Sequence, residues 1–128
     1  MKDTYSDFSI AATLVPAVQA ATANGTAVDL QGFNSATLVI NTGAIASSGL
    51  YAIKIQESAT TTDGDFTDVA AADLLGSLPA GLAADTAYKQ GYVGNKRYVR
   101  AVITKTSGTS IAAGAVFVRS HANDAPVA

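Results

Sequence analysis

The sequence predicts an all-β fold: an antiparallel β-sandwich or jelly-roll-like barrel with one short helix and an extended N-terminal arm. Apolar and polar residues alternate over residues 50–57 and 97–105, which is the period-two pattern of a half-buried strand. Turn signals such as Asn24-Gly25 and Gly94-Asn95 separate short apolar runs. This spacing favours antiparallel strands over the alternating strands and long helices of a parallel sheet.

The 128 residues suit one domain with three parts. Residues 1–25 are rich in Ala and Thr and contain Pro16, so we expect an extended arm or edge strand there rather than a helix. Residues 26–120 carry the strand patterns and are the expected β-sandwich domain. Residues 121–128 contain Pro126 and are expected to form a loose tail. An arm of this kind predicts that deleting residues 1–20 leaves the β body folded.

Within the sandwich domain, the strand signals differ in kind. The run at 36–41 is apolar and β-branched, which predicts a strand buried on both faces. Residues 97–105 give the clearest strand, and residues 111–119 are expected to form a final strand after the turn at Gly108. Residues 70–75 predict one or two helical turns that end at Gly76. The expected buried residues are Phe33, Val39, Ile53, Ile55, Val99 and Ile103.

Composition excludes several classes of function. The net charge is −2 and no basic stripe is present, so a nucleic-acid partner is not expected. The chain has no cysteine, which excludes disulfides, thiolate catalysis and Cys-ligated zinc. No apolar run reaches the roughly 18 residues of a membrane helix. Asp3 and Asp7 stand where a secretory signal needs positive charge, so we read the N-terminus as mature.

The residues that carry chemistry are few. The single histidine, His121, lies in the expected tail, away from any frame that could orient it. Glu57 with Asp68 is a conceivable carboxylate pair, although charges on strand edges are usually solvated. The segment Asp63-Gly64-Asp65, with Asp68, is the only cluster that resembles a cation site, and a solvated turn explains it better. We therefore expect no enzymatic activity, no cofactor and no metal.

A small group of cationic and aromatic residues is the best candidate for a protein interface. Arg97, Tyr98 and Arg100 follow Lys96 on the clearest strand, and Arg and Tyr are enriched at binding hot spots. The alternative is that the Arg stems cover apolar surface. Ion pairing of either arginine with Glu57 or with an acidic partner is a third interpretation. In the N-terminal segment, Tyr5 and Phe8 are further interface candidates.

Most of the chain resembles a family of small structural proteins encoded beside the major capsid protein of tailed bacteriophages. The matching stretches are ATANGTAVDLQGFNSATLVINTGAI (21–45), IKIQES (53–58), FTDVAAADLLG (66–76), YVGNKRYVRAVIT (92–104) and the closing AGAVFVRSHANDAPVA. The resemblance implies a capsid decoration, or cement, protein. It also implies binding to the major capsid protein, self-association as a trimer or binding as a monomer around a symmetry axis, synthesis in the bacterial cytoplasm and a place on the phage head surface.

Two other functions remain open from the sequence. A head–tail connector, tail tube or tail terminator component would use an inserted loop such as residues 77–86, but no long helix is expected here. A carbohydrate-binding or host-attachment β-sandwich would normally expose tryptophan, and the chain has none. Closed rings or tubes would favour the former function, and glycan binding the latter.

Overall fold

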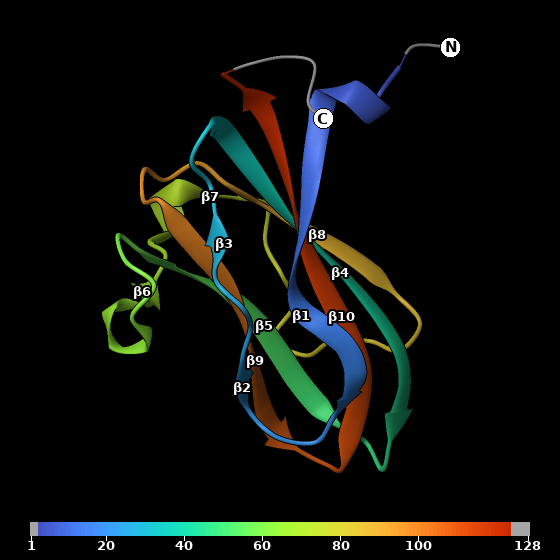
Figure 1. The fold of residues 1–128 in the computed structure, drawn as a ribbon. Coiled ribbons are helices and arrows are strands. Elements are labelled where there is room, and N and C mark those ends of the chain that lie inside the picture. The colour runs from blue at the N-terminus through green and yellow to red at the C-terminus, as the bar shows by residue number, and fades with distance from the viewer. Residues whose placement is uncertain (1–2, 124–128) are drawn as a thin grey trace.

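The computed structural model describes residues 3–123 and confirms the all-β prediction: two antiparallel sheets pack face to face (Figure 1). The first sheet has five strands, which in spatial order are β1 (Phe8–Gln19), β10 (Ser110–Ala122), β4 (Phe33–Ala46), β8 (Ala87–Tyr92) and β7 (Leu74–Leu75). The second sheet has the order β2 (Ala23–Asn24), β9 (Tyr98–Ser107), β5 (Leu50–Ser58) and β6 (Thr67–Asp68), with β3 (Val28–Asp29) also paired to β9.

At one end of the sandwich, two short connections run side by side from one sheet to the other. The β4–β5 connection and the β9–β10 connection each pass from one sheet to the other. They lie against each other there, since Ser110 pairs with Ala46 and Leu50 with Ser107. Gly108 has a φ of +78°, and a Cβ at this position would collide with the backbone of Ser48 and Gly49. The close approach of the two turns therefore requires glycine.

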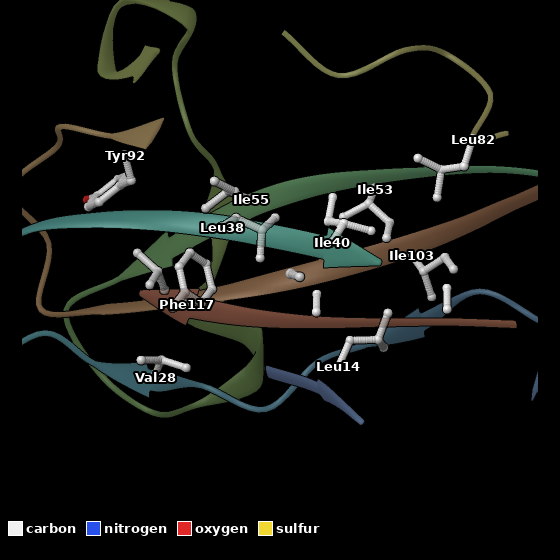
Figure 2. Packing of buried hydrophobic residues seen from close by; sticks show 14 of the residues in the cluster. Leu14, Val28, Leu38, Ile40, Ile53, Ile55, Leu82, Tyr92, Ile103 and Phe117 are labelled. Atoms are coloured by element: carbon white, nitrogen blue, oxygen red, sulfur yellow. The ribbon is translucent and has the colours of Figure 1, made fainter. Parts of the chain in front are cut away.

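The core lies between the sheets and consists mainly of aliphatic side chains from the long strands, with the aromatic residues Tyr51, Tyr92 and Phe117 (Figure 2). Four of the predicted core residues are buried, namely Ile53, Ile55, Val99 and Ile103. The other two predictions were wrong, because Val39 and Phe33 are only half-buried. Val39 lies between the buried Leu38 and Ile40 and so points out of the sandwich.

The N-terminal segment is an edge strand, one of the two forms expected for it. Strand β1 pairs with β10 from Phe8 to Gln19 and lies at the end of the first sheet. Leu14 joins the core, and the buried Thr13 hydroxyl donates to the carbonyl of Thr26 and accepts from the amide of Ala101. Because these contacts connect the sheets, deletion of residues 1–20 removes core material and is now expected to destabilise the domain.

The short helix and the tail differ from their predicted forms. Residues 71–73 make one 3₁₀ turn, η3 (Ala71–Asp73), and β7 follows directly. Strand pairing is favoured there because it places Leu74 against the core beside Tyr92. Two further 3₁₀ turns are η1 (Tyr5–Asp7) and η2 (Asp63–Asp65). The expected tail begins later than residue 121, since His121 and Ala122 end β10, and its remaining residues 124–128 lie outside the described residues.

Candidate interaction surface

The predicted Arg–Tyr group does not form one surface. Arg97 is exposed and makes a two-point ion pair with Asp29, from Nε to Oδ1 at 3.0 Å and from Nη2 to Oδ2 at 2.8 Å. Its guanidinium also lies 5.0 Å from the ring centre of Tyr98, which is half-buried. The Arg97 guanidinium holds the pKa of Asp29 below its usual value. Arg97 therefore ties β3 to the start of β9.

Arg100 is buried and belongs to the structure of the second sheet. Its Nε and Nη2 donate to Oε1 of Gln56 at 3.0 and 2.8 Å. Its Nη1 pairs with Asp63, and the guanidinium stacks 4.2 Å from the ring centre of Phe66. These contacts fasten the loop between β5 and β6 onto the sheet. The predicted pairing of either arginine with Glu57 was wrong, because Asp29 and Asp63 take those positions.

Tyr5 and Phe8 lie at the free edge of the first sheet. The side chain of Tyr5 is 83% exposed, on the turn η1. Phe8 begins β1, where it pairs with Ser120. Of the five predicted interface residues, only these two lie near the surface described next.

The outer face of the first sheet is nearly free of charge. The outward positions of β1, β10 and β4 follow from the register and from the alternation with core residues. Most of them are apolar or small: Phe8, Ile10, Ala12, Val18, Ala112, Gly114, Val116, Val118, Thr37 and Val39. Ser35, Asn41 and Ser120 are polar outward positions of the same strands. Lys89, which pairs with Val39, is the one charged side chain among the outward positions of β1, β10, β4 and β8 within residues 8–12, 35–41, 87–91 and 112–120. We call this surface the apolar face.

The apolar face is both exposed and hollowed. Val18 is 70% exposed and Ile10 58% exposed. A shallow hollow of about 500 Å³ lies over β1, β10 and β4, with Val18, Val39 and Val116 in its lining. Gly114 lies beneath Pro16, because a Cβ at residue 114 would overlap the proline ring. The face therefore offers a continuous apolar surface with a contour that a partner could fill.

The signal for the apolar face was present in the sequence. The run at 36–41 is apolar on both sides of the strand, which predicted burial on both faces. The run at 111–118 is also apolar or small on both sides. In a two-layer sandwich only one side of each strand meets the core. The other side then remains exposed, and in this molecule that exposed side forms the apolar face.

The outer face of the second sheet is polar and its charges are paired. Lys54 Nζ lies 3.0 Å from a carboxylate oxygen of Asp68, and Gln56 donates to the same carboxylate at 2.9 Å. Both contacts lower the pKa of Asp68, with the Gln56 hydrogen bond as the larger cause. The Arg100 guanidinium likewise lowers the pKa of Asp63. This face has its charged groups matched within the chain.

Each carboxylate of the candidate catalytic pair and of the candidate cation cluster has its own partner within the chain. Asp63 pairs with Arg100, Asp65 accepts a 2.6 Å hydrogen bond from Thr60, and Asp68 pairs with Lys54. Glu57 accepts a 2.7 Å hydrogen bond from the Tyr92 hydroxyl. Between residues 3 and 123, no three His, Cys, Asp or Glu side chains come together as a metal site.

Two other groups have structural explanations. His121 is held at the end of β10, with Nδ1 2.7 Å from the Ser35 hydroxyl oxygen on the sheet surface. A cleft of about 490 Å³ lies between residues 30–36 and 92–97, with Tyr92 in its lining. The Tyr92 hydroxyl donates to Glu57 and accepts from the Lys96 amide. Burial, reinforced by the Glu57 contact, raises the pKa of Tyr92 well above its usual value, so this phenol stays neutral.

No family model, no curated protein and no solved structure matches the chain. Within residues 3–123, no helix has the length and apolar character needed to cross a membrane.

Proposed function

We propose that this protein is a virion structural protein that decorates and stabilises the assembled head of a tailed phage. It would be made in the cytoplasm of the host bacterium and would bind the major capsid protein on the head surface. The observation that supports this proposal most directly is the apolar face, a nearly uncharged sheet surface with Val18 and Ile10 largely exposed. The sequence resemblance to proteins encoded beside the capsid gene supports the same function.

The two outer faces suit such a function. Removing apolar area from water contributes about 25 cal/mol per Å², so covering the apolar face with a shell is favourable. The charged groups of the opposite face stay in water when the protein docks, so docking carries no free-energy penalty for desolvating them. A repeated lattice presents many identical sites, and binding to the assembled shell but not to the dissociated subunit stabilises the shell by mass action.

The test is co-sedimentation of the purified protein with phage heads that lack it. We expect saturable binding at a fixed ratio to the capsid protein and a higher melting temperature of the decorated heads. Val18→Asp places a charge on the apolar face at an exposed position and should abolish binding. Thr104→Asp adds the same charge to the outer side of β9 in the second sheet and should bind like the wild type.

Three results would contradict the proposal. Failure to bind shells, with rings or tubes formed by the protein alone, would favour a connector or tail component. Failure to bind shells, with retention on a glycan array, would favour a host-attachment module. Equal binding by the two variants would show that the apolar face is not the docking surface.

A further inference from the structure

Strand β1 is the last strand of the first sheet, and within residues 3–123 no other strand pairs with its outer edge. A sheet edge exposes unpaired backbone N–H and C=O groups, and proteins usually protect it with very short strands, lysines, prolines or bulges. Strand β1 has twelve residues, whereas the strands at the other sheet ends, β7, β2 and β6, have two each. Among the described residues, β1 is thus the one long strand at the end of a sheet.

The other edges have visible protection. β7 covers only the end of β8, and the rest of that edge carries Lys89. β6 covers only Gln56 and Glu57 of β5, and the remainder carries Lys54. Both lysines are exposed and oppose pairing with a further strand. The long β9 is covered along much of its length by β2 and β3 together.

Within β1 the protection covers only the second half. The register shifts on either side of Leu14, Pro16 lacks an N–H, and the Thr13 carbonyl accepts from the Thr26 amide. Residues 8–12 instead pair regularly with β10 and contain no charge, no proline and no bulge. Alternate residues of this stretch direct their backbone groups to the open side. We call residues 8–12 the open edge.

We propose that the open edge pairs antiparallel with the open edge of a second copy of this chain, about a two-fold axis at Ile10. This register sets Ile10 opposite Ile10, and Phe8 opposite Ala12. No charged residue lies within the stretch, so the pairing opposes no like charges. Asp7 of each copy lies opposite Thr13, and the two Asp7 residues are six positions apart, about 20 Å at 3.4 Å per residue. That separation exceeds the Debye length of about 8–10 Å.

A second copy fits this edge because the stretch is self-complementary, as a two-fold interface requires. The outward side chains Phe8, Ile10 and Ala12 of both copies then continue the apolar face across the joint. The pairing uses the strand edge and leaves the outward surface uncovered, so it is independent of the proposed docking. A joint of five residues is small, which predicts a concentration-dependent dimer.

The test uses the absence of cysteine from the chain. Residues directly opposite in antiparallel strands have Cα atoms about 4.5–5.5 Å apart, within the range that a disulfide spans. We expect Ile10→Cys to form a covalent dimer under mild oxidation at least about tenfold faster than Val18→Cys. Val18 is a matched control, since it lies on the same strand, is similarly exposed and is outside the open edge.

Sedimentation of the cysteine-free chain, from about 10 µM to about 1 mM, gives a second measurement. We expect the wild-type chain to exchange between monomer and dimer. The Ile10→Lys variant should lose the dimer and the Val18→Lys variant should keep it. Circular dichroism should show that both variants are folded. A monomer at every concentration, a trimer, or equal cross-linking of the two cysteine variants would overturn the proposal. All of these measurements are made without phage heads, so failure of the dimer proposal can be distinguished from failure of the docking proposal.

Discussion

The outer faces of the two sheets differ in how their side chains are satisfied. On the second sheet, Lys54 and Arg100 have carboxylate partners within the chain. On the first sheet, most outward residues of β1, β10 and β4 are apolar or small, and Ile10 and Val18 among them are largely exposed. A surface with matched charges is complete in water, whereas an exposed apolar surface is stabilised by being covered. This difference is the basis of the proposal that the apolar face is the docking surface.

The largest expected effect comes from the core that both faces share. Ile103 is fully buried on β9, and Ile103→Asp would place an unpaired charge between the sheets. We expect a loss of more than about 4 kcal/mol, which leaves the protein unfolded. Thermal unfolding measures this effect, with Thr104→Asp as the control because residue 104 points to the other side of the strand. A folded Ile103→Asp variant would show that the register of β9 is wrong.

The next largest effect is a change on the second sheet that should lower the stability of the protein without changing its binding to phage heads. Arg100→Met removes the hydrogen bonds to Gln56 and the contact with Asp63 but keeps an apolar stem against Phe66. We expect a loss of about 2 kcal/mol, typical of buried hydrogen bonds to a charged group, and unchanged binding to phage heads. Denaturant unfolding and co-sedimentation measure the two properties.

Arg97→Met is the matched control for Arg100→Met. Its pair with Asp29 is exposed, and exposed ion pairs contribute little to stability, so we expect a smaller loss of stability than in Arg100→Met. If Arg100→Met bound heads poorly while remaining folded, the division between the two faces would be incorrect.

A smaller effect follows from pH. The pKa values of Asp63 and Asp68 are lowered from the usual 3.8 by contacts in the folded state. A carboxylate with a lowered pKa adds stability that is present above pH 3.8 and is lost as the pH falls through the folded pKa. We therefore expect Asp63 and Asp68 to take up protons only below pH 3.8, with the amide chemical shifts of η2 and β6 changing in that range. Asp68→Asn should remove the change at β6, and a change at β6 centred above pH 3.8 would contradict this prediction.

The sequence predicted the strands that alternate and missed features that depend on contacts distant along the chain. The period-two pattern over 50–57 predicted β5 and its buried Ile53 and Ile55 correctly. The partners of Arg97 and Arg100 were not predictable, because Asp29 and Asp63 reach them only through sheet pairing and loop return.

The same limit applies to the interface expected at Arg97, Tyr98 and Arg100, which stays a prediction. Arginine and tyrosine on one strand suggested a binding surface, but their charges are matched inside the molecule. The apolar run at 36–41 was recognised as apolar on both sides, and Val39 was expected to be buried. Only the two-layer architecture shows that one of those sides is exposed. Periodicity identifies which residues share a side, and the number of layers decides whether that side is covered.

The most direct test of the central claim is the solvent accessibility of single cysteines on the two faces. Val39→Cys places a thiol on the apolar face, and Thr104→Cys places one on the outer side of the second sheet; both native residues are half-buried. Labelling with a maleimide in the presence and absence of phage heads compares the faces within one fold. We predict that heads protect Cys at position 39 and leave position 104 reactive. Protection of position 104 alone, or of neither position at saturating heads, would contradict the assignment of the apolar face as the docking surface.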